Sequence, residues 1–185
     1  MALAIRDAAL ADAPQIAALY AGEVRHGINT YELEVPDAAE MAMRMQHLLA
    51  AGYPYLVAES DGAFAGYAYA SSFRARAGYR HTVENSVYVS PAHQGEGIGT
   101  ALMERLVEEC TNRGYRQMVS VIGDPGNMAS IRLHERFGFR HIGTFPGIAF
   151  KHGRWLDTVF MQRALGHEGA AGALPSDRIN PTNGD

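Results

Sequence analysis

The residues of this sequence whose types and spacing best suggest chemistry lie between Glu84 and Thr100. A β-branched and aromatic run ends at Ser90-Pro91, and a glycine-rich turn then leads into an apolar-periodic segment, which predicts a strand, a loop and a helix. Gly95, Gly97 and Gly99 leave the turn without side chains where a helix N-terminus exposes unpaired N–H groups. The turn therefore predicts a site for an anion, most naturally a pyrophosphate, although an ordinary tight connection is the simpler alternative.

Two common nucleotide-binding motifs use the same physics but fit this turn poorly. The spacing Gln94-x-x-Gly97-x-Gly99 lacks the first glycine of the dinucleotide fingerprint, and no Gly-Lys-Ser/Thr follows it. A nucleotide site of either kind would predict stabilisation of the protein by NAD or ATP but not by coenzyme A.

The composition limits the classes of function. A chain of 185 residues with 47% hydrophobic residues is long enough for one globular domain with a sizeable core. The net charge of -4 offers no basic field for nucleic acid or an anionic membrane. The single cysteine, Cys110, the early charge at the N-terminus and the lack of a long apolar run all predict a cytoplasmic protein.

The elements that must position the turn follow from periodicity and from helix and turn signals. Helices are expected from Asp12 and Pro14 onward and over residues 37–51, 97–113 and 129–137. Further strands are expected over residues 2–6, 55–59, 64–73, 118–122, 140–145 and 154–162, the last two separated by a loop containing Lys151-His152-Gly153. The segment 22–36 is too polar and broken for a regular element and too apolar for a solvated linker, so it is expected to form a loop that covers a substrate. Residues 166–185 are expected to form a disordered tail after a domain of residues 1–165.

This order of elements predicts an α/β fold, a sandwich of a mixed sheet flanked by about four helices. A doubly wound sheet is disfavoured, because several strands follow one another without helices between them. The buried stripe of the 97–113 helix is expected at Ile98, Leu102, Leu106 and Cys110, which recur at intervals of four.

The glycine turn, with the segment from Asn127 to Phe139, resembles the acyl-CoA-binding signatures of the GCN5-related N-acetyltransferase superfamily. His134 stands where most members have a tyrosine, and the motifs Glu84-x-x-Val-Tyr-Val-Ser-Pro and Phe150 to Asp157 are similar to the phosphinothricin acetyltransferase branch. That branch includes enzymes acting on methionine sulfone and methionine sulfoximine. The resemblance covers residues 2–165 and implies a mostly antiparallel sheet splayed at the acetyl-CoA strand, acetyl-CoA as cosubstrate without a metal, an amino-acid-like substrate and a homodimer.

The resemblance also implies a set of cofactor-binding residues. The strand that binds pantetheine, the turn that binds pyrophosphate, the helix after it and the start of the 129–137 helix supply Val87, Tyr88, Val89, Gln94, Gly95, Glu96, Gly97, Ile98, Gly99, Thr100, Asn127 and Ser130. The backbone N–H of Val89 is expected to stabilise the charge that develops on the thioester oxygen. Many relatives carry Arg or Lys directly after the glutamine, where this chain has Gly95-Glu96, and the acidic Glu96 predicts weaker affinity for acetyl-CoA.

Two residues are expected to move protons, because an α-amino group must lose a proton before it attacks a thioester. Glu84 is the candidate base and needs burial or a relaying water; its alternative role is a strand-edge pair with Arg74, Arg76 or Arg80. His134 replaces the usual proton donor and titrates near neutrality, with its direction of proton transfer open. Its alternative role is a histidine packed on the inner face of a helix.

The substrate-binding residues are expected in two loops. Arg74, Arg76 and Arg80 can clamp a carboxylate, although each is equally compatible with a solvated surface. Tyr79, Asn29 and Tyr31 match the region that shapes the acceptor pocket in the branch. Lys151, His152, Trp155 and Asp157 are expected in the pocket wall, the strand connection or a dimer contact.

The sequence therefore predicts a cytoplasmic enzyme that acetylates the α-amino group of a small amino-acid-like molecule, by direct transfer because Cys110 lies on an apolar stripe. Phosphinothricin-resistance enzymes tend to carry an acidic residue at the position of Arg80. The arginine here therefore favours methionine derivatives over phosphinothricin as the acceptor. Two alternatives are transfer to another amine, which the arginines disfavour for cationic acceptors, and a catalytically silent acyl-CoA-binding module.

Overall fold

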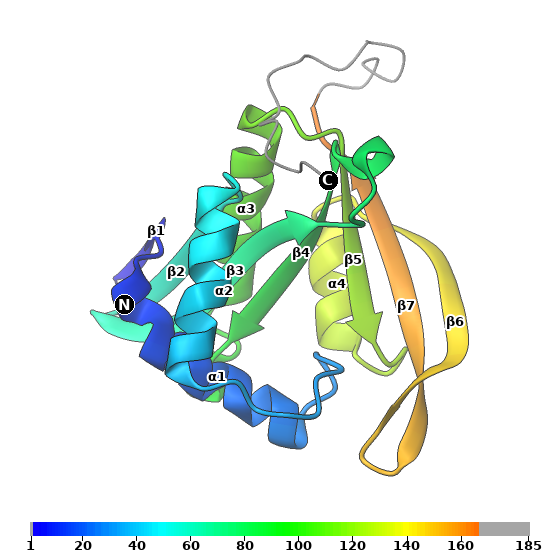
Figure 1. Cartoon of the computed structure of the whole chain (residues 1–185), viewed down its shortest axis with the longest axis horizontal. Coiled ribbons are helices and arrows are strands. Elements are labelled where there is room, and N and C mark those ends of the chain that lie inside the picture. The colour runs from blue at the N-terminus through cyan, green and yellow to red at the C-terminus, as the bar shows by residue number, and fades with distance from the viewer. Residues whose placement is uncertain (1, 167–185) are drawn as a thin grey trace.

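A seven-stranded sheet forms the centre of the protein in a computed structural model that describes residues 2–166 (Figure 1). Of the predicted tail, residues 167–185 lie outside the described residues. The helices and strands follow in the order β1 (Leu3–Asp7), α1 (Ala13–His26), α2 (Ala38–Ala50), β2 (Tyr55–Ser60), β3 (Ala63–Ser72), β4 (Thr82–Val89), α3 (Ile98–Asn112), β5 (Gln117–Gly123), α4 (Met128–Arg136), β6 (Arg140–Lys151) and β7 (Arg154–Ala164).

The sheet is mixed and mostly antiparallel, with the strand order β1-β2-β3-β4-β5-β7-β6. Its parallel pair is β4 with β5, and this pair is short, joining only residues 82–84 to residues 117–119. Beyond Glu84, the two strands diverge, as Figure 1 shows, while β4 stays paired with β3 as far as Val89. The predicted fold class, including a splay at this strand, is confirmed.

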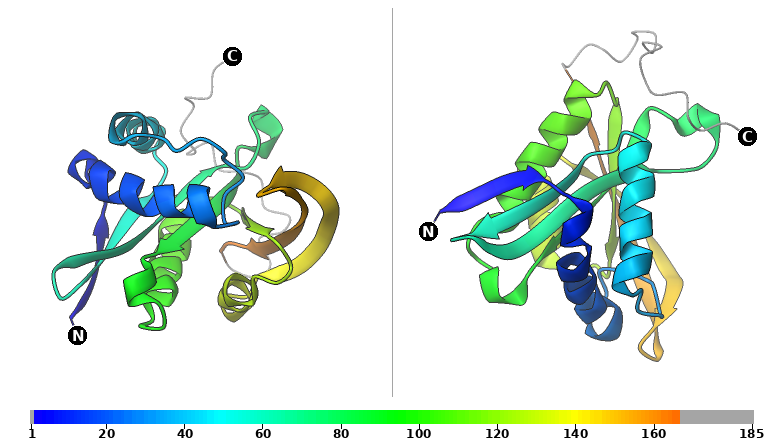
Figure 2. Two further views of the ribbon diagram at one scale, coloured as in Figure 1. Left: turned by 90° about the horizontal axis from the view of Figure 1, so that it is seen from below. Right: turned by 60° about the vertical axis from the view of Figure 1, so that its left-hand side comes forward.

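Helices cover both faces of the sheet (Figure 2). On one face, α1 and α2 pack on a cluster of tyrosines and apolar residues that includes Tyr55, Tyr67 and Tyr88. On the other face, α3 buries the predicted stripe Ile98, Leu102, Leu106 and Cys110 against the sheet. Each helix thus removes one apolar face from water, which is the main stabilising contribution.

Local signals set the ends of several elements as predicted. The side chain of Asp37 accepts a hydrogen bond from the Glu40 N–H and caps α2. Asp61 and Gly62 form the turn between β2 and β3, both with positive φ.

The β6–β7 hairpin differs from its prediction. β6 continues to Lys151 instead of ending at Phe145, and only His152-Gly153 separates it from β7. The register shifts between Phe145 and Ala149, where Gly147 has a φ of 57°. Pro146 and Gly147 weaken the strand pattern in the sequence, yet an irregularity in the ladder accommodates them without ending the strand.

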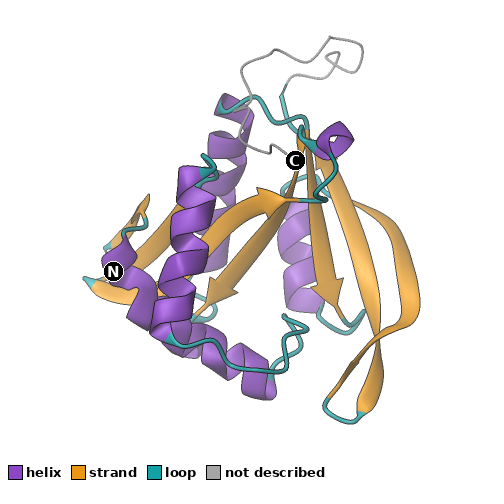
Figure 3. Cartoon of the chain, in the orientation of Figure 1, coloured by secondary structure: helices purple, strands orange, loops and turns teal. Residues whose placement is uncertain are grey.

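The loops gather at the ends of the strands, and the segment after α1 lies across the opening between β4 and β5 (Figure 3). No helix among residues 2–166 is long and apolar enough to cross a membrane.

Candidate active site

The divergence of β4 from β5 opens a pocket of about 950 Å³. Its walls come from β4, β5, the glycine turn, α3, α4 and the loop after α1. Of the sequence-predicted site residues, the pocket is lined by Glu84, Val87, Tyr88, Val89, Gln94, Gly95, Gly97, Ile98, Gly99, Thr100, Asn127, Ser130, His134, Asn29 and Tyr31. Most of the predicted site residues are therefore brought together in one place.

Backbone N–H groups of β4 point into this pocket. The N–H of Ser90 donates to the Ala65 carbonyl on the β3 side, so the alternating residues Val87 and Val89 direct their N–H groups towards β5. The ladder with β5 has already ended at Glu84. Val87 and Val89 consequently offer donors to a ligand lying between the strands, as the sequence predicts for Val89.

The glycine turn takes the shape expected of an anion site. Gly95 and Gly97 have φ values of 84° and 83°, which glycine adopts without strain. Gly97 is the N-cap of α3 and brings no side chain over the exposed N–H groups of the first turn. Glu96 does not line the pocket, and its carboxylate lies 3.0 Å from Nδ1 of His93. The carboxylate of Glu96 is therefore directed towards His93 and not into the pocket where an anionic ligand would bind.

The start of α4 forms the opposite wall. The Asn127 side chain caps the helix by accepting from the Ser130 N–H at 3.2 Å, as predicted, and its amide donates to Asn29 at 2.7 Å. Two arginines of the same helix, Arg132 and Arg136, also line the pocket. They add positive charge beside the glycine turn, where the sequence showed an acid in place of the usual cation.

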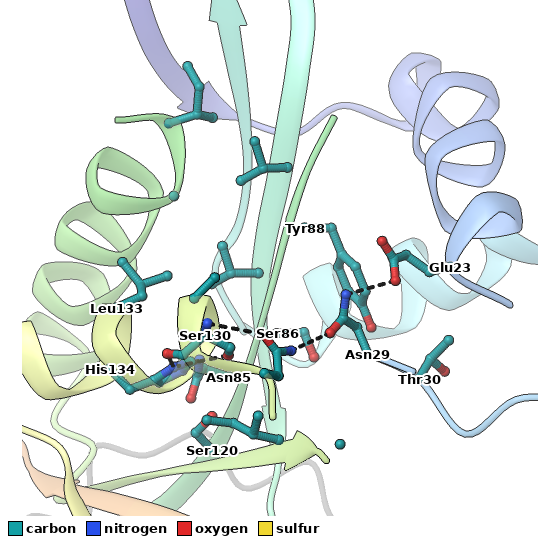
Figure 4. Close-up of a pocket in the computed structure, with 18 of the residues that line it drawn as sticks. Glu23, Asn29, Thr30, Asn85, Ser86, Tyr88, Ser120, Ser130, Leu133 and His134 are labelled. Atoms are coloured by element: carbon teal, nitrogen blue, oxygen red, sulfur yellow. Dashed lines mark hydrogen bonds between the residues drawn. The ribbon is translucent and has the colours of Figure 1, made fainter. Parts of the chain in front are cut away.

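His134 is 3% exposed and is held by two polar partners. Its Nδ1 lies 2.7 Å from the carbonyl oxygen of Ser130, and its Nε2 lies 2.9 Å from the Asn85 side-chain nitrogen (Figure 4). The ring of Phe139 meets it edge-on. Burial lowers the pKa of His134, and the Ser130 carbonyl opposes this only in part. The histidine is thus packed inward, and it also reaches the pocket.

Glu84 lines the pocket at the point where the β4–β5 ladder ends. Burial raises the pKa of its carboxyl above the ordinary range, and the positive charge of Arg74 opposes part of the rise. A carboxylate with a raised pKa is a better proton acceptor, which suits the predicted role as a base.

The loop after α1 closes the pocket on the side of the tyrosine cluster. Gly123, at the end of β5, lies so close that a Cβ there would come within 2.1 Å of the Ile28 carbonyl oxygen. Asn29 donates to Glu23 at 2.8 Å, and the hydroxyl of Tyr31 is hydrogen-bonded to that of Thr158. The loop is therefore fixed at both ends of the segment that faces the pocket, consistent with a substrate cover.

Lys151 binds this loop from the β6–β7 hairpin. It is 2% exposed, and its ammonium group donates to the carbonyl oxygens of Thr30 at 2.8 Å and Glu23 at 3.1 Å. His152 lies 3.0 Å from the carbonyl oxygen of Gly27. Neither residue lines the pocket, and His152 lies in the predicted strand connection; their contacts with the loop were not predicted.

The basic loop between β3 and β4 lies apart from the pocket wall. Arg74, Arg76, Tyr79 and Arg80 are all exposed and do not line the pocket. Arg74 is the member whose charge reaches Glu84. A carboxylate clamp formed by all three arginines is thus not assembled in this structure, whereas a single contribution from Arg74 is compatible with it.

Several pocket residues escaped the sequence analysis. Asn85 is a polar residue on a strand face that otherwise carries Val83, Val87 and Val89, and this break in an apolar face is the signal that identifies it. Arg132 of α4 also lines the pocket, next in sequence to Leu133, whose side chain lies near Gly99. The remaining pocket residues outside the predicted set and the covering loop include Tyr20, Tyr69, Ser86, Ser120 and Gly123.

The arrangement can bind an elongated ligand with an anionic group at the α3 N-terminus and a carbonyl between β4 and β5. Acetyl-CoA has both features, and the open glycine cradle and the free β4 donors fit it. Within residues 2–166, no group of three or more His, Cys, Asp or Glu side chains is placed to hold a metal ion.

Comparisons with known proteins agree with this geometry. Residues 17–139 match the model of the acetyltransferase (GNAT) family. The chain is 47% identical over 154 residues to a phosphinothricin N-acetyltransferase of Alcaligenes faecalis, covering 83% of this chain and 78% of that protein. It is 39% identical over 171 residues to an L-methionine sulfoximine/L-methionine sulfone acetyltransferase of Salmonella typhimurium, covering 92% and 99%.

A solved structure is similar over the whole fold. The crystal structure of a GNAT superfamily phosphinothricin acetyltransferase from Sinorhizobium meliloti, in complex with AcCoA, has a TM-score of 0.91 to this protein. The two are 47% identical, and the match covers 98% of this chain and 97% of that one.

Proposed function

Because this chain belongs to the acetyltransferase (GNAT) family, it is an acetyl-CoA-dependent N-acetyltransferase, and we propose that its acceptor is a small amino acid with a tetrahedral side-chain group. This class of acceptor includes phosphinothricin, L-methionine sulfoximine and L-methionine sulfone. The names of two relatives, at 47% and 39% identity, support this class, and acetylation would serve to detoxify such compounds.

The observation that carries the proposal is the position of Glu84. Its carboxyl lines the pocket where the β4–β5 ladder ends, and burial raises its pKa. The positive charge of Arg74 interacts with it and opposes part of that rise. A base and a cation in this relation suit an α-amino acid, in which an ammonium group and a carboxylate sit on one carbon. Glu84 removes a proton from the ammonium, directly or through water, and Arg74 attracts the carboxylate.

The remaining steps use groups already described. The N–H of Val89 stabilises the negative charge that develops on the acetyl carbonyl oxygen. The glycine turn from Gly95 to Gly99 binds the pyrophosphate, and Arg132 and Arg136 add attraction for the phosphates of coenzyme A. His134, which lines the pocket from α4, takes part in the proton transfer that accompanies acetyl transfer.

Transfer occurs directly between the two substrates in this scheme. Cys110 lies on the buried face of α3, and burial raises the pKa of its thiol to about 12. A buried thiol of such low acidity does not become a thiolate near neutral pH, so it does not carry the acetyl group.

A homodimer is the assembly that the surface supports. The β6–β7 hairpin exposes the large apolar side chains Ile142, Phe145, Ile148, Phe150 and Trp155. The rings of Phe150 and Trp155 lie 5.2 Å apart, and Trp155 is 68% exposed. Apolar side chains gathered in this way usually mark an interaction site, and a second copy of the chain is the partner proposed. The cytoplasm, where acetyl-CoA is available and a lone cysteine stays reduced, is the proposed location.

The function is tested by measuring thiol release from acetyl-CoA with L-methionine sulfone, L-methionine sulfoximine, L-phosphinothricin, L-methionine, spermidine and a peptide amine. We expect saturable release with at least one of the first three, and their relative kcat/KM values assign the preferred acceptor. Saturable release with spermidine or the peptide alone would reject the proposed acceptor class and leave the acetyl-CoA chemistry in place.

A further inference from the structure

The hydrogen bonds of His134 define its protonation state. Nδ1 lies 2.7 Å from the Ser130 carbonyl oxygen, and a carbonyl oxygen can only accept, so Nδ1 carries the proton. Nε2 lies 2.9 Å from the Asn85 side-chain nitrogen, which can only donate, so Nε2 is the acceptor. The ring is therefore a neutral imidazole with a single N–H, and that N–H is used by Ser130.

Asn85 occupies a place where an apolar residue would pack more easily. It is 6% exposed, on the same strand face as Val83 and Val87, and an amide buried there is costly unless it is hydrogen-bonded. Its nitrogen binds His134, but its Oδ1 atom has no hydrogen-bond partner among the described residues. A buried amide with one unused acceptor suggests a role that a valine could not fulfil.

We propose that Asn85 is a positioning residue that holds His134 in the tautomer protonated at Nδ1, so that Nε2 enters the reaction as a proton acceptor. The proposal rests on the proposed function, in which His134 takes part in acetyl transfer. It assigns the direction that the sequence left open, because a ring whose one N–H is bound to Ser130 has no proton to give to a thiolate at the start.

The protons balance in this scheme. The acceptor ammonium first loses a proton to Glu84 and solvent, and the amine nitrogen then bonds to the acetyl carbon. As the Asn85 amide turns and its N–H leaves Nε2, the amine nitrogen gives its surplus proton to the freed lone pair of His134. The C–S bond breaks with its electron pair on sulfur, and Nε2 passes the proton to the sulfur. The products are the amide, the free thiol and neutral His134, ready for the next turnover.

The two ends of the Asn85 amide suit the two states of the ring. Rotation of the amide by about half a turn exchanges its nitrogen and oxygen, an exchange familiar for asparagine side chains. Oδ1, unpartnered in the neutral state, would then accept from a protonated Nε2. A leucine at position 85 could hydrogen-bond to neither state of the His134 ring, and an aspartate there could hydrogen-bond only to the protonated ring.

The other groups around the ring do not supply this control. Phe139 contacts it edge-on, with ring centroids 4.9 Å apart, and the Ser130 hydroxyl lies 3.4 Å from Nδ1. The guanidinium of Arg163 lies over the Phe139 ring, 6.0 Å from its centre. Among the contacts described for Nε2, Asn85 alone is polar.

The tautomer is tested on the free enzyme by NMR of ¹⁵N-histidine-labelled protein, with the His134 signals assigned by their loss in His134→Gln. We expect a protonated Nδ1 and an unprotonated Nε2 at neutral pH in the unmodified protein, and protonation of both nitrogens in Asn85→Asp. A protonated Nε2 in the unmodified protein would overturn the proposal. This readout needs no acceptor, so it is independent of whether the proposed substrate class is correct.

The role in catalysis is tested by kinetics of the same variants, with the most active acceptor of the panel. We expect Asn85→Asp and Asn85→Leu to lower kcat by tenfold or more, with acetyl-CoA binding and the acceptor KM nearly unchanged. The control Asn112→Asp makes the same change at an exposed position at the end of α3 and should retain full activity. Unchanged kcat in Asn85→Asp, with the NMR shift present, would reject the positioning role and leave the proposed function intact.

Discussion

Glu84 and Asn85 are consecutive residues of β4, and their side chains therefore lie on opposite faces of the sheet. Asn85 points to the α4 side, where it binds His134 at 2.9 Å, whereas Glu84 points to the side of the tyrosine cluster and the loop after α1. Both reach the pocket, because β5 has left β4 at this level. Glu84, and His134 through its contact with Asn85, thus reach one pocket from the two faces of one strand.

Replacing Glu84 by glutamine removes the proposed base with little change in shape. We expect kcat to fall by roughly 10²-fold or more, with acetyl-CoA binding retained by calorimetry. In the unmodified enzyme, kcat/KM should decline as the pH falls through the raised pKa of Glu84, since the base must be deprotonated to act. Glu104→Gln, an exposed change on α3, is the control. Full turnover in Glu84→Gln would remove this residue from the mechanism.

The buried His134 should make the protein sensitive to acid. Its pKa is lowered in the folded state, so the unfolded chain binds a proton at a higher pH than the folded one does. The free energy of unfolding must then decrease as the pH falls through the ordinary histidine range and below it. Urea unfolding at pH 7 and pH 5 should show a smaller decrease for His134→Gln than for the unmodified protein. The exposed His47→Gln should leave the decrease unchanged, and an equal decrease in all three would contradict the prediction.

Replacing Lys151 by methionine keeps the buried stem and removes the donor to the loop. The carbonyl of Thr30 then loses its bond, and we expect the free energy of unfolding to drop by about 1–3 kcal/mol. Because the loop covers the acceptor side, the acceptor KM should rise several-fold while acetyl-CoA binding stays the same. Arg154→Met removes an exposed cation of the same hairpin, which pairs with Asp124, and should change neither quantity much. An unchanged acceptor KM in Lys151→Met would show that the loop does not contribute to the acceptor site.

Gly97 and Gly62 form a matched pair for testing the anion cradle. Both have left-handed backbone, with φ of 83° and 82°, and a Cβ at either position meets no atom within 4 Å. Alanine should therefore cost about 1–2 kcal/mol of stability at each site from backbone strain alone. Only Gly97→Ala should also weaken acetyl-CoA binding, by tenfold or more in a calorimetric titration, because its methyl group lies at the N-terminus of α3. Equal affinities in the two variants would indicate that the turn does not hold the pyrophosphate.

The proposed dimer depends on the exposed hairpin. Trp155→Asp should shift sedimentation at micromolar concentration from dimer to monomer, because a charge in an apolar interface is costly to bury. Met43→Asp, at an exposed apolar position on α2, should leave the dimer intact. A monomer in the unmodified protein at these concentrations would refute the dimer itself.

Much of the fold could be predicted because its signals are local. The alternation in the strands, the spacing of four in α3 and the caps Asp37 and Asn127 each arise from residues close in sequence. The end of β6 could not be predicted, since Pro146 and Gly147 are strand breakers and pairing with β7 compensates for them. Tertiary pairing of this kind leaves no trace in a short window of sequence.

The site was predictable where a motif carried it and less so where it is assembled from distant segments. Residues of the glycine turn line the pocket as expected, with the exception of Glu96, which turns to His93. The contact of Lys151 with Thr30 joins residues more than a hundred positions apart, and periodicity says nothing about it. The arginines of the β3–β4 loop stay a prediction as substrate ligands: they are exposed and do not line the pocket, and composition alone does not indicate which of them meets a carboxylate.

The burial of Lys151 has one more consequence, which concerns the protein as a target of its own chemistry. It is the only lysine in the sequence, and its ammonium group is held by two carbonyl oxygens at 2% exposure. Lysine amines on a protein surface are the usual competitors for an activated acetyl group. The described surface of this enzyme presents none, so its cosubstrate has no lysine of the enzyme within reach to modify.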